Sequence, residues 1–364
     1  MAHARITALE AAPGRLTLDE DDWTYVQQGL AANTRGTYAS AIKRFLAFCD
    51  RLNIPLHDRI PASEILLIKF VSFLAKEKLK PGSINTYLVG VRSAHVDAGL
   101  GNPLEGKLLL RRALRGVFRV HGTPRQPRYP VTIDILRRIC AANTGDPWED
   151  RLFAAAATLG FYGFLRAGEF VIKARTYNAS VHPAVGDVAF HVKDTVAGQA
   201  LRGFEFTIKA SKTDQFRVGS KIFIGVGLAL PCPVIAMASY AAPRAHLPDT
   251  APSSPLFVHA DGTIFTHAQF INALEQRLCV AGIPVAGFSG HSFRIGAATT
   301  AAAAGVEDSL IRAMGRWRSD CYRTYIHTPV DTLMNVSARM ASANIAPGSF
   351  IFDPFGGGEP DIVF

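Results

Sequence analysis

Residues 201–225 read LRGFEFTIKASKTDQFRVGSKIFIG, and they decide the fold class because they interrupt a chain that otherwise follows helical patterns. Within this stretch Phe204, Phe206 and Ile208 alternate with polar residues, which is the period of a half-buried strand. A short turn, SKTDQFR, separates it from a strand-like run at 218–225, and GDVAFHV at 186–192 resembles a third strand. The sequence therefore predicts a small three-stranded antiparallel sheet in a mainly α protein.

The rest of the chain follows helical periodicity, with apolar residues three and four positions apart up to about residue 120. Helices are also expected at 131–142 and 150–165, and from Pro231 to about residue 342. We predict an all-α unit of four or five helices, followed by a mixed α+β unit. The expected division is a flexible lead-in at 1–20, a helical domain at 21–120, a linker at 121–130, a second domain at 131–342 and a C-terminal tail at 343–364.

Composition limits the class of protein. The chain has 364 residues, of which 48% are hydrophobic, so it can build two packed cores and is not disordered overall. No stretch is apolar and long enough to cross a bilayer, and the first residues lack the apolar core of a signal peptide. The five cysteines are scattered without a CxxC pair, which disfavours a disulfide framework or a zinc site. We expect an intracellular protein without a membrane partner, a metal ion or a cofactor.

Positive charge is concentrated in one segment of a chain whose net charge is +9. Between Glu105 and Asp134 there is no acidic residue, and the basic residues lie on an expected helix at 108–120 and on the proline-containing stretch after it. Such a segment is either a solvated helix face with a tether or a surface for the phosphates of DNA. The candidate DNA-binding residues are Lys107, Arg111, Arg112, Arg115, Arg119, Arg125 and Arg128.

The first candidate for chemistry is the motif FLRAGEF, at 164–170. Its Arg166 and Glu169 are three residues apart, so they can pair on a helix. A single pair of this kind is usually structural. A carboxylate can also hold an arginine so that its planar guanidinium grips a phosphate.

Two further candidates lie in a turn and at a helix start. Lys212 stands between two predicted strands, where lysines are usually just solvated, but from which an ammonium group can also donate a proton to a ligand. In the motif GHSFR, His291 and Arg294 are three residues apart at the expected start of a helix, where an anion is favoured.

The last candidate is GRWRSDCYRTYI, at 315–326, which contains Trp317, Tyr322 and Tyr325. Aromatic residues at this spacing are more often part of a core than of an active site. Together, however, the candidates supply the parts of a tyrosine-dependent phosphodiester reaction. Two arginines can face the charge that builds on the non-bridging oxygens. A phenol needs a base, and a leaving 5′-oxygen needs a proton donor.

This constellation resembles that of the tyrosine recombinases, which include phage integrases, the Xer proteins and Cre recombinase. The resemblance covers about residues 20–340 and implies a helical core-binding domain that clamps DNA, followed by a catalytic domain. The GRWRSD and YxxYI motifs are most similar to those of recombinases from Crypton- and DIRS-type eukaryotic mobile elements. The implied function is site-specific recombination or integration that mobilises a transposable element, through a 3′-phosphotyrosyl intermediate and a free 5′-hydroxyl.

The resemblance also implies a role for each candidate residue. The implied set is Arg166 and Arg294 as phosphate ligands, His291 as base, Lys212 as general acid, Trp317 as donor to a non-bridging oxygen, Tyr325 as nucleophile, and Glu169 as a supporting carboxylate. The implied partners are double-stranded DNA and further copies of the chain, in a tetramer on two DNA sites, with the tail at 343–364 as a candidate for exchange between protomers. The implied location is the nucleus for a eukaryotic mobile element, and the cytoplasm or nucleoid otherwise.

Two residue assignments and two functions stay open. Trp317 and Tyr325 are eight positions apart, one fewer than expected from well-known members, so Tyr322 is a rival nucleophile. Lys209, on a predicted strand, is a rival of Lys212 as general acid. The alternative functions are a DNA-binding protein that descends from a recombinase without its activity, and a type IB topoisomerase.

Overall fold

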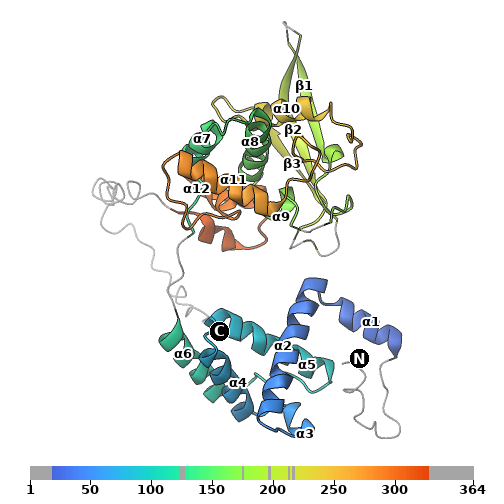
Figure 1. The fold of residues 1–364 in the computed structure, drawn as a ribbon, viewed down its shortest axis with the longest axis vertical. Coiled ribbons are helices and arrows are strands. Elements are labelled where there is room, and N and C mark those ends of the chain that lie inside the picture. The colour runs from blue at the N-terminus through green and yellow to red at the C-terminus, as the bar shows by residue number, and fades with distance from the viewer. Residues whose placement is uncertain are drawn as a thin grey trace, which may run out of the picture. The chain divides into compact units, whose positions relative to one another are not determined.

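A computed structural model describes residues 19–122, 128–173, 176–195, 198–211, 214 and 218–327. The chain forms two compact units, one before and one after residue 125 (Figure 1). Several predictions fall, in whole or in part, outside the described residues: the lead-in at 1–20, the linker at 121–130 with Arg125, Lys212, the helices expected between 328 and 342, and the tail at 343–364.

The first unit is helical, and six helices are found in its described part. This number exceeds the predicted four or five because neither the first helix nor the short third one buries a residue, so neither leaves an apolar stripe in the sequence. The first helix also begins inside the predicted lead-in. The helices are α1 (Glu20–Gln28), α2 (Ala32–Arg51), α3 (Leu56–Arg59), α4 (Glu64–Lys76), α5 (Pro81–Asp97) and α6 (Leu108–His121).

The core of the first unit lies where α2, α4 and α5 meet. Phe45 of α2 and Phe70 of α4 are fully buried, with their ring centroids 5.1 Å apart in an edge-to-face arrangement. The sixth helix closes this core with Leu110, which is 2% exposed. The amide of Leu110 donates to the Glu64 carboxylate at 3.0 Å, so the start of α6 is tied to the start of α4.

The second unit contains the small sheet and the remaining helices. Its strands run antiparallel in the order β1–β2–β3, so the predicted fold class is confirmed. The chain between α10 and α11 is not helical, contrary to the prediction, and contains the bridge between Val258 and Ile264. The elements are α7 (Ile133–Ala141), α8 (Pro147–Tyr162), α9 (Ala167–Phe170), β1 (Val188–Thr195), β2 (Gly198–Ile208), β3 (Ser220–Gly225), α10 (Pro233–Arg244), α11 (His267–Val280), α12 (Ser292–Ala303), α13 (Asp308–Met314) and the 3₁₀ helix η3 (Asp320–Tyr325).

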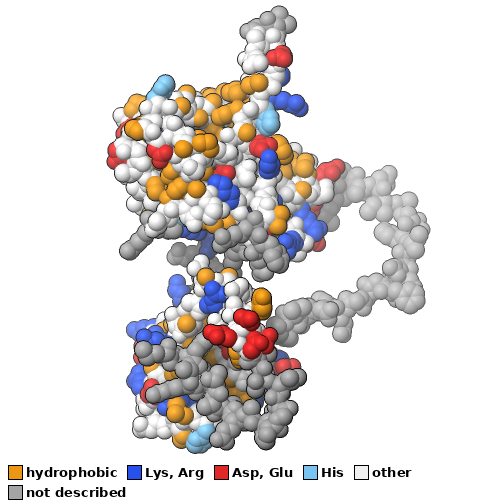
Figure 2. Space-filling model, turned by 90° about the vertical axis from the view of Figure 1, so that its right-hand side faces the viewer, with side chains coloured by type: hydrophobic (Ala, Val, Ile, Leu, Met, Phe, Trp, Pro, Cys, Tyr) orange, Lys and Arg blue, Asp and Glu red, His pale blue; other side chains and the backbone are white. Residues whose placement is uncertain are grey.

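Helix α8 runs through the middle of the second unit, with the sheet and α10 on one side and α7 and α12 on the other (Figure 1). Its apolar residues lie all around the helix because nearly every side chain from Leu152 to Phe161 is buried. The β1–β2 hairpin, by contrast, projects from the body of this unit and is exposed along most of β1 (Figure 2).

The predicted helix at 150–165 ends early, at Tyr162. Phe164 adopts a left-handed backbone conformation, with φ at +52°, and this turns the chain away from the helix axis. Arg166 therefore stands at the N-cap of the short helix α9 rather than at the end of α8.

Gly296 lets α12 approach the backbone of Val131, just before α7. A methyl group there would collide with the backbone carbonyl of Val131, whose amide donates to the Ser292 carbonyl at 2.9 Å. We expect Gly296→Ala to lower the free energy of unfolding by about 1–3 kcal/mol, measured by urea denaturation. The added methyl group meets backbone atoms, which cannot move aside as the end of a flexible side chain can. Gly116→Ala, on α6, adds a methyl group in open space and should not destabilise its own unit. Unchanged unfolding of Gly296→Ala would contradict the tight contact.

Candidate active site

Four segments of the second unit bring the predicted catalytic residues together. Arg166 precedes α9, and His291 and Arg294 stand at the start of α12. Trp317 follows α13, and Tyr325 ends η3, which packs against α12. Residues separated by up to 159 positions along the chain thus surround one site, within a single compact unit.

Glu169 holds two arginines, one on each carboxylate oxygen. Its Oε1 lies 3.0 Å from Nη1 of Arg166, and its Oε2 lies 2.8 Å from Nη2 of Arg316. The carboxylate is 4% exposed, while the two arginine side chains remain 24% and 21% exposed. Glu169 also accepts from the backbone amide of Arg166 at 3.0 Å, so it fixes both the chain and the guanidinium.

Arg316 was not among the sequence candidates, although it directly precedes Trp317. Its backbone is left-handed, with φ at +53°, and its Nη1 donates to the Gly163 carbonyl at 3.2 Å. The structure therefore adds a third arginine to the two that the sequence indicates. The signal that could have revealed it is its place in the GRWR motif, next to a candidate residue.

Arg294 lies beneath the site and is fully buried. Its guanidinium donates to the backbone carbonyls of Phe164 and Gly315, and its centre lies 4.3 Å from the ring centroid of Trp317. Burial, together with the Arg166 charge, lowers the pKa of Arg294 to about 10, so the group stays charged at neutral pH. Its Nε has no hydrogen-bond partner among the described residues, and the same is true of the indole nitrogen of Trp317.

The hydroxyl of Tyr325 faces His291. The distance between its oxygen and Nε2 of His291 is 3.4 Å, and the two rings are 5.4 Å apart between centroids. Such a separation is long for a hydrogen bond, but catalytic contacts commonly shorten when substrate binds. The Tyr325 ring also contacts the Trp317 ring at 5.3 Å, so its direction is set by packing on both sides.

Tyr322, the rival nucleophile, points its hydroxyl elsewhere. Its side chain is 3% exposed, and its oxygen donates to the Asp308 carboxylate at 2.7 Å. Arg323 donates to the same oxygen at 3.3 Å. This geometry favours Tyr325 over Tyr322 as the tyrosine that a ligand of His291 and the arginines would meet.

His291 is neutral at physiological pH. Burial and, after it, the nearby cations Arg128, Arg294 and Arg166 together lower the pKa of His291 from 6.5 to about 4. A neutral imidazole can accept a proton, so His291 is available as a base at any pH above about 4. Arg128, a predicted DNA-binding residue, is therefore close enough to act on the site through its charge.

We expect the imidazole signals of His291 to titrate near pH 4 in the protein without DNA. Proton NMR of the full chain can measure this, with His291→Gln used to assign the signals. Arg128→Gln should raise the midpoint because one repelling cation is removed. A bound DNA duplex should raise it further, since phosphates offset the arginine charges. A midpoint at or above 6.5 without DNA would contradict the cationic surroundings that the structure describes.

Comparison with solved structures identifies the architecture. The XerH site-specific recombinase in a post-cleavage complex with a palindromic difH substrate is 14% identical, with a TM-score of 0.59 over 89% of this chain and 86% of that one. The Tn1549 transposon integrase in complex with transposon right end DNA is 13% identical, with a TM-score of 0.53 over 88% and 98%. The chain has the tyrosine recombinase fold. No family model and no curated protein matches the sequence.

The sequence predicted Lys212 as general acid, with Lys209 as its rival. Lys212 lies outside the described residues. The side chain of the rival Lys209 already has partners within the fold. Its Nζ lies 2.7 Å from the Asp187 carboxylate and donates to the Ala179 carbonyl at 2.8 Å. Lys173, which the sequence did not single out, is exposed and contributes to the lowered pKa of His291. Among described lysines, Lys173 is thus the one whose charge reaches this histidine.

Helix α6 of the first unit packs one face on the core and exposes arginines together with the apolar residues Leu108, Leu109, Phe118 and Val120. Leu110, Leu114 and Val117 pack toward the core of that unit. The opposite side presents arginines that are exposed to solvent, and no acidic residue lies in its first turn. The exposed candidates described here are Arg111, Arg112, Arg115, Arg119 and Arg128, while Lys107, at the N-cap of α6, is partly buried.

Neither a metal cluster nor a membrane span is found in the described part of the chain. No group of three or more His, Cys, Asp or Glu side chains there could hold a metal ion. No helix in the same part of the chain combines the length and the apolar character that a bilayer span requires.

Proposed function

We propose that the chain is a site-specific DNA recombinase or integrase that cuts and rejoins DNA through Tyr325. The observation that carries this proposal is the position of the Tyr325 hydroxyl, 3.4 Å from a neutral histidine and next to buried and half-buried arginines. A phenol beside a base and a cluster of guanidinium groups is suited to attack a phosphodiester.

The proposed reaction forms one bond to phosphorus and breaks another. The Tyr325 oxygen attacks the scissile phosphate, and its proton passes to Nε2 of His291. The bond to the 5′-oxygen breaks, and this oxygen takes a proton from Lys212, which leaves a 3′-phosphotyrosyl link and a free 5′-hydroxyl. Rejoining is the reverse, with the 5′-hydroxyl of a new strand as the attacking group.

Two guanidinium groups bind the phosphate in this proposal, and a third, that of Arg316, supports the site through Glu169. Arg166 is held by Glu169 with its side chain still partly exposed, so it can grip a non-bridging oxygen. Arg294 and the indole nitrogen of Trp317 offer buried donors without partners among the described residues. Arg316 keeps Glu169 paired, which prevents that carboxylate from repelling DNA.

The proposal also includes the assembly of the protein on DNA and its role in a mobile element. The solved structures with this fold include a recombinase on its difH substrate and a transposon integrase on transposon end DNA. We extend this to a tetramer on two DNA sites, with the tail at 343–364 exchanged between protomers, and to a role in moving a Crypton- or DIRS-type element. The basic side of α6 is suited to hold the duplex through its phosphates.

Covalent capture tests the proposed function. The purified full-length chain is incubated with randomised duplexes that carry a nick near the variable region, so that a cut releases a short fragment and traps the intermediate. We expect complexes that survive SDS, enriched for a restricted set of sequences, with a free 5′-hydroxyl on the released strand.

Each alternative function predicts a different result, either in this experiment or in a plasmid-relaxation assay. Sequence-selective DNA binding without any SDS-stable complex would favour a DNA-binding protein without activity, and would overturn the proposal. Relaxation of supercoiled plasmid by the monomer, without sequence selection, would favour a type IB topoisomerase instead.

A further inference from the structure

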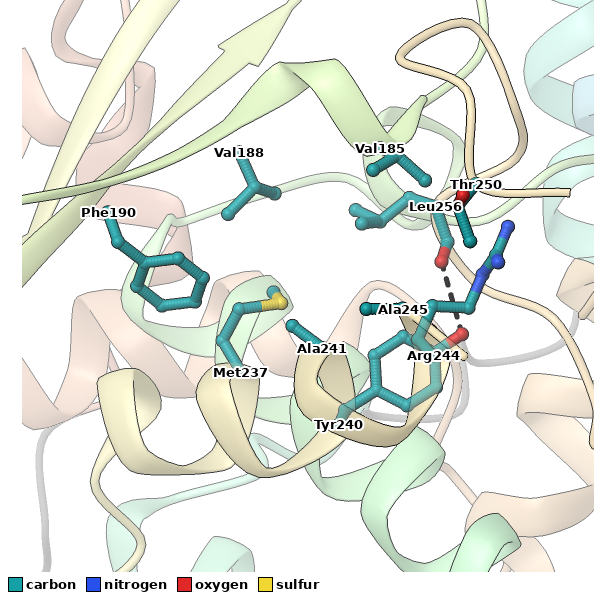
Figure 3. A pocket seen from close by; sticks show the side chains of 10 residues that line it. All are labelled: Val185, Val188, Phe190, Met237, Tyr240, Ala241, Arg244, Ala245, Thr250 and Leu256. Atoms are coloured by element: carbon teal, nitrogen blue, oxygen red, sulfur yellow. Dashed lines mark hydrogen bonds between the residues drawn. The ribbon is translucent and has the colours of Figure 1, made fainter. Parts of the chain in front are cut away.

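A pocket of about 170 Å³ lies between the sheet and α10, and none of the residues that line it belongs to the candidate active site. Figure 3 shows its apolar end, where Val188 and Phe190 of β1 face Met237 and Ala241 of α10. Met237 is fully buried, so this end belongs to the interior of the unit. An apolar cavity of roughly 150 Å³ is large enough to hold benzene. A ring of that size therefore fits within the pocket as a whole.

The other end of the pocket is formed by Arg244, the last residue of α10, and by Thr250 (Figure 3). Arg244 is 5% exposed, and its Nη2 donates to the Pro255 carbonyl at 3.2 Å. Its Nε and Nη1 are buried and have no hydrogen-bond partner among the described residues. A buried cation in this situation is costly unless an anion or an acceptor joins it.

Among the described residues, the Tyr240 hydroxyl is the neighbouring polar group of the pocket that interacts with Arg244, but it is shared with the backbone. The hydroxyl of Tyr240 donates to the Leu256 carbonyl at 3.1 Å and accepts from the Val258 amide at 2.9 Å. Its hydrogen-bonding capacity is thus largely used within the fold. Arg244 is the one charged side chain among the described residues that line the pocket.

We propose that this pocket binds a small monocarboxylate with a compact apolar body, of about the size of benzoate. The carboxylate accepts hydrogen bonds from Nε and Nη1 of Arg244, and the apolar body lies against Val185, Ala241 and Leu256, in the middle of the pocket (Figure 3). A singly charged anion balances one guanidinium, whereas a phosphate dianion would leave an uncompensated charge beside apolar walls. An uncharged apolar ligand would leave the two buried N–H donors without acceptors.

Benzoate titration of the full-length chain tests this proposal, with benzamide as an uncharged ligand of the same shape. We expect saturable binding of benzoate by calorimetry and a rise in Tm, with affinity at least 10-fold higher than for benzamide. Arg244→Gln should remove this preference. Ala241→Phe should weaken benzoate binding at least 10-fold by filling the middle of the pocket while keeping Arg244.

A matched control lies on the same helix. Ile235 is 52% exposed and does not line the pocket, so Ile235→Phe adds a similar ring to α10 and should leave benzoate binding unchanged. The absence of saturable benzoate binding would overturn the proposal. Equal binding of benzoate by Ala241→Phe, or equal stabilisation by inorganic phosphate, would overturn it as well. Because Ala241→Phe retains Arg244, this variant tests the proposed binding site even if Arg244→Gln does not fold.

Discussion

Tyr325→Phe should abolish the SDS-stable complex with DNA, a loss on the order of 10³-fold or more in the rate of strand cleavage. The substitution removes only the oxygen that faces His291. The ring keeps its contacts with Trp317 and with the guanidinium of Arg294, so the fold and DNA binding should persist. The measurement is single-turnover cleavage of a selected nicked duplex, alongside a binding assay on the same DNA.

Tyr322→Phe is the matched control for this prediction, because it removes a hydroxyl from the same 3₁₀ helix. Its cost should be structural, through the lost hydrogen bond to Asp308, and cleavage should remain within about 10-fold of the unmodified chain. The opposite pattern, in which Tyr322→Phe alone prevents the covalent complex, would make Tyr322 the nucleophile.

Arg166→Gln should lower the cleavage rate by about 10²–10³-fold, which is the usual cost of removing one donor to a developing negative charge. The fold should tolerate the change because the Arg166 side chain is partly exposed and Glu169 keeps Arg316 as its partner. Binding of the duplex should weaken less than cleavage, since other basic residues still contact phosphates.

Arg137→Gln offers a control with a similar local pair. Arg137 lies in the same unit, pairs with Asp134 at 2.7 Å across three positions, and is 48% exposed. Its loss should change neither cleavage nor binding by more than about 2-fold, as expected of a surface ion pair. Equal losses for Arg166→Gln and Arg137→Gln would mean that Arg166 contributes only general positive charge.

The sequence predicts the central strand of the sheet well because this strand has one buried face. Phe204, Phe206 and Ile208 alternate along β2, and all three side chains are at most 2% exposed. The end of α8 was predicted less well. A left-handed backbone at Phe164 ends that helix region, and a phenylalanine gives no sign of this conformation, which glycine or asparagine usually adopts.

The candidate site was predictable to the extent that its chemistry restricts residue types. Two arginines, a histidine and a tyrosine in a fixed order indicate it, and the structure brings Arg166, His291, Arg294, Trp317 and Tyr325 together. The role of Arg316 could not be predicted from the sequence. Its pair with Glu169 joins residues 147 positions apart and depends on a left-handed backbone at Arg316 itself.

The central claim is that the Tyr325 oxygen forms the covalent link to DNA. Proteolysis of the SDS-stable complex, followed by mass spectrometry, identifies the residue that carries the nucleotide. We predict a nucleotide 3′-phosphate on the Tyr325 oxygen and a free 5′-hydroxyl on the released strand. A link at any other residue, or a link through a 5′-phosphate, would contradict this account.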